Sequence, residues 1–564
     1  MVRNIFKTLN KEISGVHQAA FLLGFFALAS QFLALIRDRL LAHNFGAGQT
    51  LDVYYAAFRV PDLIYLSIAS LVSISVLIPF FSGMIEDKKE ETKDFFDALF
   101  TSFMIMMIVV SVIAYIFLPK LTNILLPGAS LKEAADVASL SRILLIQPIC
   151  LGISNLLGIV TQMYKRFFIY ALSPVFYNAM IIFGIIFLSP YYGIKGVVAG
   201  VVLGGIAHFL IQIPFVWQKG FVPRFRLKFD RKKLFKIMML SVPRTITLSA
   251  VSIESIFITS FASLMSSGSI AVFNFSLNLQ SVPLAIIGVS YASAAFPTLS
   301  ALFCRGEREK FLEHMNVAAR QIIFLSLPVT ALFVVLRAQI VRVILGSGHF
   351  SWNDTRLTAA CLALFTVSLV AQGLEILFIR AYYAAGKTTK PLMVNLISSV
   401  LTITLPYVFM KLFTDVPVFA FFIESLFKIE HIPGSIVLML PLGFSIGTII
   451  NAIVFWFMFA KDFSSSAKPL TVTFFHSFAG AVIMGFAAYI GLGISAPWFN
   501  DDTLMGVFSQ GLTGGVFGIA VGLFILKLLR NPELEELIQS LQVRFSRIKK
   551  DKIVVPEPEK VDIS

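Results

Sequence analysis

Long apolar stretches separated by short polar segments recur along the whole chain. Each is about 20 residues long or more, which is the length an α-helix needs to cross the hydrocarbon core of a bilayer. The pattern therefore predicts an all-α polytopic membrane protein with about fourteen spans. The spans are centred roughly in 16–36, 53–80, 97–118, 140–162, 169–190, 195–217, 237–262, 270–300, 317–345, 357–384, 391–412, 435–460, 471–493 and 505–529.

Composition agrees with this pattern. The 564 residues are 57% hydrophobic and only 14% charged, with a mean hydropathy of +0.84, far from the range of soluble proteins. The first apolar run lacks a small-residue cleavage site, so we expect it to be the first span and not a signal peptide. The three cysteines, Cys150, Cys304 and Cys361, have no metal or redox spacing, and we expect no cofactor and no metal.

The residues behind the net charge of +14 lie mainly on one predicted side of the membrane. Lysine and arginine gather after the even-numbered spans and at the two termini, roughly thirty on that side against roughly ten on the other. The positive-inside rule then places both termini in the cytoplasm. This distribution argues against a nucleic-acid partner and allows contact with anionic membrane lipids.

Two echoes in the sequence indicate an internal repeat. The Val-Pro pair that ends at Pro61 recurs at Pro283, and the Pro174-to-Asn178 spacing recurs from Pro391 to Asn395. The offsets of 222 and 217 residues agree on one register, although chance proline spacing is the alternative. An even number of spans per repeat predicts two six-helix lobes in parallel pseudo-repeat, with a site between them.

This repeat gives a predicted domain organisation. Two additional helices and a charged tail follow the second lobe, and segment 411–434 is a partly apolar external connection that could contain a short interfacial helix. The predicted parts are an N-terminal lobe (1–218), a basic cytoplasmic linker (219–236), a C-terminal lobe (237–460), two additional transmembrane helices (461–530) and a cytoplasmic tail (531–564).

The first two spans carry the densest polar chemistry. Arg37 and Asp38 end the first span, Asp52 precedes the second, and Arg59 and Pro61 lie near the start of the second. Charges on apolar helices are costly in lipid and usually face a bundle interior or a watery cavity. A prolyl kink frees backbone groups that neighbouring helices or water must satisfy. The stretch therefore predicts one wall of a polar cavity.

Several candidates have a plainer alternative. Arg37 and Arg59 could instead snorkel to lipid headgroups, and Asp52 could simply cap the second span. Gln31 and Asn278 could be polar contacts between helices. Glu254, in the middle of the seventh span, is either a coupling-ion site or a silent buried acid. Arg244 lies directly behind Pro243 near the start of the same span. No motif of an enzyme is present in the sequence.

The charged stretch also resembles a known family. Arg37-Asp38, the FGAG segment at 45–48, Asp52 and Pro61 are similar to the most characteristic region of the lipid II flippases, the MurJ/MviN family of the multidrug/oligosaccharidyl-lipid/polysaccharide exporter superfamily. The likeness extends in consistent order over about residues 16–460. Further matching positions are Arg166-Phe167 with Pro174 and Asn178, Gly204-Gly205 with Gln212 and Pro214, Ser267-Gly268-Ser269, Pro283 with Pro297, and Arg380 to Ala384 before Pro391.

The resemblance implies export of the peptidoglycan precursor lipid II across the bacterial cytoplasmic (inner) membrane by alternating access around a cationic cavity. It implies lipid II as substrate, a coupling ion (H⁺ or Na⁺) or the membrane potential as driving force, and cell-wall synthesis proteins as possible partners. The implied substrate-binding residues are Arg37, Asp38, Arg59, Arg244, Gln31, Asn278 and Asp52, with Glu254 for ion coupling.

The chain also departs from the family. Gln31, Tyr65 and Asn278 stand where the family usually has arginine. We therefore predict that Arg59 and Arg244, from opposite lobes, replace the missing cations and approach each other in one state. The alternatives are a paralogue moving another polyprenyl-diphosphate glycan, a drug/cation antiporter, or a non-transporting scaffold in cell-wall assembly.

Overall fold

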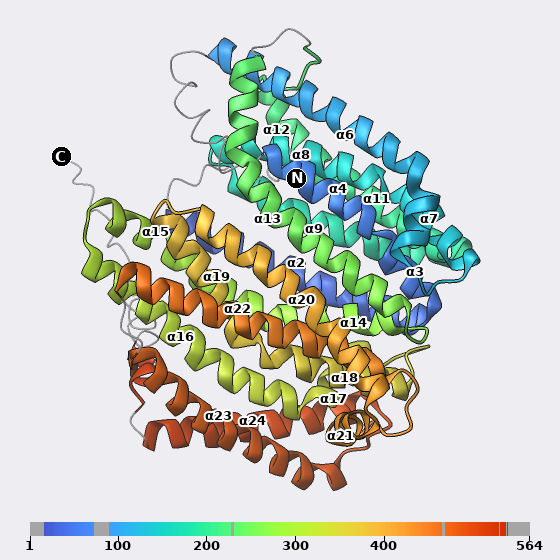
Figure 1. The fold of residues 1–564 in the computed structure, drawn as a ribbon, viewed down its shortest axis with the longest axis vertical. Helices are drawn as coiled ribbons and strands as arrows, with labels where there is room; N and C mark the ends of the chain where they lie inside the picture. The colour runs from blue at the N-terminus through green and yellow to red at the C-terminus, as the bar shows by residue number, and fades with distance from the viewer. Residues whose placement is uncertain are drawn as a thin grey trace, which may run out of the picture.

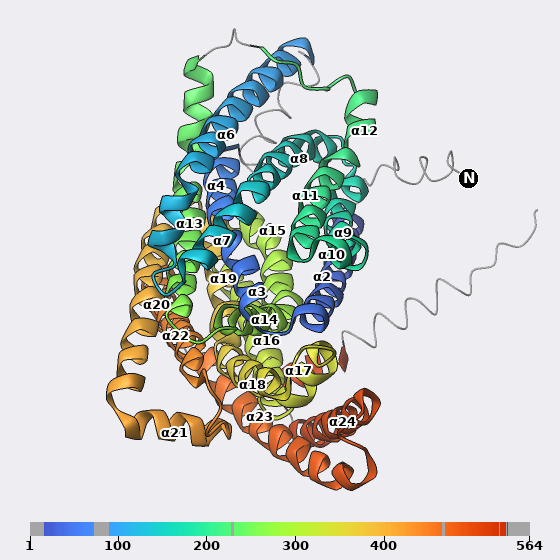
Figure 2. The ribbon, with the colours of Figure 1, turned by 90° about the vertical axis from the view of Figure 1, so that its right-hand side faces the viewer.

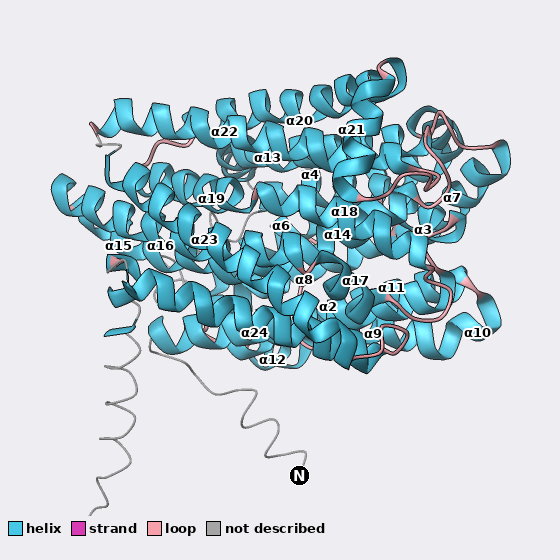
Figure 3. Cartoon of the chain, turned by 90° about the horizontal axis from the view of Figure 1, so that it is seen from below, coloured by secondary structure: helices cyan, strands magenta, loops and turns pink. Residues whose placement is uncertain are grey.

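Every regular element in the described part of the chain is a helix (Figure 3). The computed structural model describes residues 16–72, 89–226, 231–464, 468–528, 531–536 and 538–539. The first half contains α2 (Val16–Phe45), α3 (Gln49–Ala57), α4 (Arg59–Ala69), η1 (Ser70–Val72), α6 (Lys89–Leu125), α7 (Leu131–Leu144), α8 (Ile146–Met163), α9 (Phe167–Phe183), η2 (Gly184–Leu188), α10 (Ser189–Tyr192), α11 (Ile194–Leu210) and α12 (Ile213–Gln218).

The second half is longer. It contains α13 (Arg231–Ser263), α14 (Ser269–Leu284), η3 (Ala285–Val289), α15 (Ser290–Cys304), α16 (Arg308–Val335), α17 (Arg337–Leu345), α18 (Trp352–Val367), α19 (Leu369–Ala384), α20 (Thr389–Asp415), α21 (Pro417–Phe427), η4 (Ser435–Leu438), α22 (Met439–Phe463), α23 (Lys468–Ser495), η5 (Ala496–Trp498) and α24 (Leu504–Leu528).

The all-α polytopic class is confirmed, whereas the number of spans is not. Among the described residues, eleven helices are long and apolar enough to cross a membrane, or twelve if the bent pair α18 and α19 forms one span. The first two predicted spans correspond to α2 and to α3 with α4, which are not among these helices. The predicted number of fourteen is therefore not confirmed.

The two halves of the chain occupy different parts of the bundle (Figure 1). Most of α2–α12 lies in its upper part and most of α14–α22 in its lower part, while α13 packs against both α4 and α20. We call α2–α12 the first lobe and α13–α22 the second lobe. Helices α23 and α24 pack on each other and against α16, at the edge farthest from the first lobe.

The second predicted span is broken just before its proline. Helix α3 ends at Ala57 and α4 begins at Arg59, two residues before Pro61. A proline ring clashes with the carbonyl four residues earlier, which is that of Ala57. The freed carbonyl oxygen accepts a hydrogen bond of 2.9 Å from the Ser141 hydroxyl of α7. A neighbouring helix thus provides a hydrogen bond to the carbonyl group that the kink frees, because the interior of a bilayer contains no water to do so.

The segment between the lobes is partly different from the predicted linker. Helix α13 begins at Arg231, so the last six predicted linker residues, 231–236, belong to its first turns. Before it, the chain runs along α6: the Arg224 amide donates to Asp97 at 3.0 Å, and the Arg226 amide donates to the Thr101 hydroxyl at 2.8 Å. These contacts attach the start of the linker to the first lobe.

The start of the predicted tail also folds back. The Thr473 hydroxyl donates to the buried Glu533 carboxylate at 2.6 Å, and the Arg320 guanidinium lies 3.8 Å from the same group. Arg320 also forms an ion pair with Glu536. Residues 531–536 are therefore held against α16 and α23, while residues 540–564 lie outside the described part of the chain.

Candidate substrate site between the two lobes

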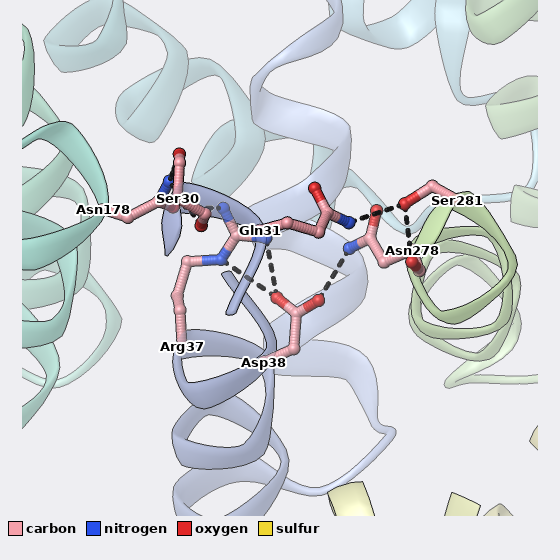
Figure 4. Close-up of polar contacts among 7 residues, drawn as sticks. All are labelled: Ser30, Gln31, Arg37, Asp38, Asn178, Asn278 and Ser281. Atoms are coloured by element: carbon pink, nitrogen blue, oxygen red, sulfur yellow. Dashed lines mark hydrogen bonds and ion pairs between the residues drawn. The ribbon is translucent and has the colours of Figure 1, made fainter. Parts of the chain in front are cut away.

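An ion pair on α2 reaches across to the second lobe (Figure 4). The Arg37 guanidinium donates from Nε and Nη2 to one oxygen of Asp38, at 2.9 and 2.8 Å. The other Asp38 oxygen accepts from the Asn278 amide of α14 at 2.9 Å. The Asp38 side chain is only 3% exposed, so this carboxylate is buried with both oxygens hydrogen-bonded.

Amides and hydroxyls extend this contact on both sides. Gln31 donates to the Ser281 hydroxyl of α14 at 2.9 Å, one to two turns from Asp38 along α2. The third nitrogen of Arg37 donates to Asn178 of α9 at 3.2 Å, and Asn178 in turn donates to Ser30 at 3.1 Å. Seven side chains from three helices therefore form one polar layer, which we call the α2–α14 layer (Figure 4).

A second cross-lobe contact is built around Arg59. Its guanidinium donates to Ser255 at 2.6 Å, to Thr259 at 2.7 Å and to Asn274 at 3.0 Å. Ser255 and Thr259 lie on α13 and Asn274 lies on α14, so all three acceptors belong to the second lobe. Each acceptor is a neutral oxygen.

Two pairs of hydroxyl groups continue this contact between α4, with η1, and α13. The Ser67 and Ser249 hydroxyl oxygens are 2.8 Å apart, and Ser70 donates to the Thr245 hydroxyl at 2.9 Å. Together with Arg59, these pairs join α4 and η1 to α13 over several turns, and we call the set the α4–α13 contact. It differs from the α2–α14 layer in having no carboxylate among its hydrogen-bonding groups.

Asp52 joins the lobes through the backbone of α14. Its two carboxylate oxygens accept hydrogen bonds from the Gly268 amide at 2.5 Å and the Ala271 amide at 2.8 Å. Asp52 therefore caps the first turn of a helix in the opposite lobe, and not the second span in which it lies. A carboxylate at a helix N-terminus also interacts favourably with the helix dipole.

Loops complete the closure at the end of the bundle where α3 lies, which we call the α3 end. The His349 amide donates to the His43 carbonyl at 3.0 Å, and Arg39 donates to the carbonyls of Val343 and Ile344. Gly46 has a φ of +65°, and a Cβ there would lie 2.6 Å from the His349 carbonyl oxygen. Only glycine allows the two loops to approach this closely.

Two of the predicted residues are not part of these contacts as the structure describes them. The side chain of Arg244 is outside the described residues, so its predicted approach to Arg59 stays a prediction. Glu254 is adjacent in sequence to Ser255 of the α4–α13 contact, but its side chain interacts with Thr402 of α20 and, electrostatically, with Glu375 of α19, which interacts with Asn451 of α22. Thus Glu254 belongs to a polar cluster inside the second lobe.

The sequence analysis missed several of these residues. Glu375 lies in the middle of an apolar helix, and the rule that singled out Glu254 would have found it. Ser255, Thr259 and Asn274 carry no such signal, because hydroxyls and amides are common in membrane helices. Tyr65, at a position where the family usually has arginine, accepts a hydrogen bond from Asn155 at 3.0 Å inside the first lobe.

The fold is shared with a class of membrane transporters. A solved structure described as an inward-facing multidrug resistance MATE family transporter of the MOP superfamily matches with a TM-score of 0.61, over 77% of this chain and 94% of that one, at 18% identity. A structure described as lipid II flippase MurJ in an inward closed conformation matches with a TM-score of 0.72, over 91% of this chain and 100% of that one, at 22% identity.

Sequence comparison identifies the family. The model of the family described as "Lipid II flippase MurJ" matches residues 41–417, which is more than half of the chain. A probable lipid II flippase MurJ of Buchnera aphidicola is 27% identical over 67% of this chain and 75% of its own. One of Thermotoga maritima is 26% identical over 68% of this chain and 77% of its own. The chain belongs to the lipid II flippase MurJ family.

Proposed function

We propose that this protein exports lipid II, the lipid-linked peptidoglycan precursor, from the cytoplasmic to the outer leaflet of the bacterial cytoplasmic membrane by alternating access between its two lobes. The observation that carries the proposal is the pair of buried, arginine-centred contacts between the lobes of a MurJ-family fold. An apolar bundle has no structural need for such charges, and a diphosphate needs paired cations in a partly dehydrated site.

The contacts also suggest how the cycle works. At the α3 end the lobes are held by Asp52 on α14 and by the loops around His43 and His349. Outward release of a headgroup at this end requires these bonds to break, and the same movement separates α4 from α13. Arg59 then loses Ser255 and Thr259, and its charge becomes available for a phosphate group. Arg37 and Asp38 remain on α2, with Arg37 as the second cation.

Orientation follows from the charge distribution. With both termini in the cytoplasm, the α3 end faces outwards and residues 218–236 face inwards. A cysteine-labelling experiment with membrane-impermeant reagent tests this orientation: a site in 218–226 should react only from the cytoplasmic side, and a site in 499–503 only from outside. The opposite reactivity would invert the direction of transport proposed here.

The second-lobe acids are candidates for ion coupling. Glu254 and Glu375 lie close enough to interact electrostatically, and the side chains of Thr402 and Asn451 interact with their carboxyl groups. We propose that this cluster takes up H⁺ or Na⁺ during the cycle. Replacing Glu254 with Gln should then remove any dependence of transport on the coupling ion without removing substrate binding at the lobe interface.

One observation supports a different substrate or a non-transporting role. Gln31, Tyr65 and Asn278, at three positions where the family usually has arginine, all make neutral hydrogen bonds or bridge to Asp38. A cavity with fewer cations would suit another polyprenyl-diphosphate glycan, and the bridges across the lobes would suit a scaffold in cell-wall assembly.

Complementation separates these possibilities. The chain is expressed in a bacterium depleted of its own lipid II flippase, with membrane insertion checked independently. Growth rescue supports lipid II export. Failure to rescue by a properly inserted protein would favour the other glycan or the scaffold, and loss of rescue in an Arg37→Ala variant would connect the activity to the proposed site.

A further inference from the structure

Helix α21 is apolar at every position except Glu424 and Ser425. It is eleven residues long, with the sequence PVFAFFIESLF. One face packs on the second lobe: Ile423 is buried, and Phe419 and Phe427 contact the core. The opposite face holds Val418, Phe421, Phe422 and Leu426, whose spacing places them within one helical stripe. All four are exposed, Val418 by 78% and Phe421 by 67%.

The helix lies flat across the α3 end of the bundle. Figure 1 shows it almost end-on while α20 and α22 run across the view, and Figure 2 shows it lengthwise. Eleven residues extend only about 17 Å at 1.5 Å per residue. This length is too short to cross a hydrocarbon core of about 30 Å. A mostly apolar helix that is too short to span, lies across its neighbours and keeps its acid on the protein side fits the membrane surface.

The exposed face of α21 continues the lipid-facing surface of α20. Tyr407, Val408 and Leu412 on α20 are exposed, and Val416 at the junction leads into Val418. Exposed apolar residues therefore extend from the side of the bundle onto the helix that crosses its end, with the exposed polar residues Lys411, Thr414 and Asp415 between them. Apolar residues that continue past a short polar stretch at the end of a lipid-facing helix have the same partner as that helix, which is the bilayer.

Cation contacts fix the helix in this position. The Arg337 guanidinium of α17 lies 5.9 Å from the centre of the Phe427 ring, and Arg356 of α18 donates to the Lys428 carbonyl. On the protein-facing side, the Ser435 hydroxyl donates to Glu424 at 2.5 Å. The helix is thus a rigid part of the second lobe, joined to the two helices next to the loop that contacts His43.

We infer that α21 is seated in the polar–apolar boundary of the bilayer, with Val418, Phe421, Phe422 and Leu426 inserted among the outer ends of the lipid acyl chains. The leaflet is the outer one in the orientation proposed above, but the insertion itself does not depend on that orientation or on the substrate. This contact anchors the part of the closed α3 end that belongs to the second lobe to the membrane surface.

Site-directed fluorescence tests the inference. Cys304 is exposed whereas Cys150 and Cys361 are buried, so a Cys304→Ser background leaves no exposed native thiol. Phe421→Cys and Phe422→Cys are each labelled with an environment-sensitive dye. The matched control is Asp501→Cys, in the exposed loop at the same end. The proteins are reconstituted in phosphatidylethanolamine–phosphatidylglycerol vesicles with a lipid brominated near the headgroup end of its acyl chain.

The inference predicts that bromolipid quenches the dye at Phe421 and Phe422 several-fold more than at Asp501, and that aqueous iodide shows the opposite order. Equal iodide quenching at all three sites would overturn it, since the face would then be in water. It would also be overturned if bromolipid failed to quench and dye–dye self-quenching rose with the protein-to-lipid ratio, because a second copy would then cover the face.

Discussion

Each of the two polar contacts between the lobes contains a buried arginine, and the two arginines are held in opposite ways. In the α2–α14 layer, Arg37 is bonded to the adjacent carboxylate of Asp38, which lies on the same helix and is shared with Asn278. In the α4–α13 contact, Arg59 donates only to the neutral oxygens of Ser255, Thr259 and Asn274. Asp62, one turn along α4, interacts with Arg59 electrostatically but forms no hydrogen bond to it in the described structure.

The difference assigns the two arginines different tasks. The Arg37–Asp38 pair carries its own counter-charge, so it can remain dehydrated in every state of the cycle without a ligand. Arg59 has hydrogen bonds but no hydrogen-bonded counter-charge, and it gives up only neutral partners when the lobes separate. A phosphate oxygen would provide a stronger, charge-assisted bond. We therefore expect Arg59 to respond most to the charge of the substrate, and Arg37 to shape the site.

Removing Arg37 should have the largest effect, because it acts on both stability and transport. In Arg37→Ala the buried Asp38 loses its partner, and breaking such a pair should cost about 3 kcal/mol of stability. Thermal unfolding of the purified protein and complementation measure the two effects.

A double variant separates the two effects of Arg37. Arg37→Ala with Asp38→Asn leaves no unpaired charge, and it should regain most of the lost stability without regaining transport. If the double variant both folded and transported like the parent, Arg37 would have only a structural role.

Removing the charge of Arg59 should impair transport and leave stability nearly unchanged. Arg59→Gln loses the cation and keeps one amide donor for the neutral acceptors of α13 and α14. A charge-assisted contact contributes about 1.5–3 kcal/mol, so substrate affinity should fall about ten- to a hundredfold. Binding of lipid II to the detergent-solubilised protein measures this. Unchanged affinity in a well-folded Arg59→Gln protein would remove Arg59 from the site.

The cap formed by Asp52 should contribute less. Asp52→Ala removes both acceptors at the N-terminus of α14, and loss of such a cap costs about 0.5–2 kcal/mol. Since the cap exists only while the α3 end is closed, its loss should shift the population towards the open state. The labelling rate of a cysteine introduced at Ser269, which is buried in the first turn of α14, should rise, with Asp52→Asn, which keeps one acceptor, giving an intermediate rate. A lower rate in Asp52→Ala would contradict this role.

The smallest expected effect concerns the kink before Arg59. Ser141→Ala leaves the Ala57 carbonyl without its hydrogen bond and should destabilise the protein by about 1 kcal/mol. In a Pro61→Ala background, the carbonyl can bond within the helix, so the same Ser141 substitution should cost less. A double-mutant cycle by thermal unfolding measures this coupling. Equal costs in the two backgrounds would show that Ser141 does not act through the proline.

The sequence predicted the fold class because apolar length is a direct consequence of bilayer thickness. It predicted a kink at Pro61, and the structure has a break between α3 and α4 two residues before it. The π-helical segment that follows Pro283 was not predicted. The helical end of the predicted linker was also missed, since charged residues such as those at 231–236 do not distinguish a cytoplasmic helix from a loop.

The candidate site was predictable only in part. Charges within apolar helices pointed to Arg37, Asp38 and Arg59, and the structure brings each of them to the lobe interface. The neutral partners on α13 and α14 were not predictable, because their role depends on which helices face each other. Asp52 showed the same limit: the sequence suggested a cap but could not show that the capped helix lies in the other lobe.

The central claim is that Arg59 becomes available only when α4 and α13 separate, and a reversible crosslink tests it most directly. The hydroxyl oxygens of Ser67 and Ser249, two turns from Arg59 along α4, are 2.8 Å apart, so cysteines at both positions can form a disulfide. In a Cys304→Ser background, oxidation should abolish lipid II translocation in proteoliposomes, reduction should restore it, and neither single-cysteine variant should respond. Full translocation by the crosslinked protein would contradict the account.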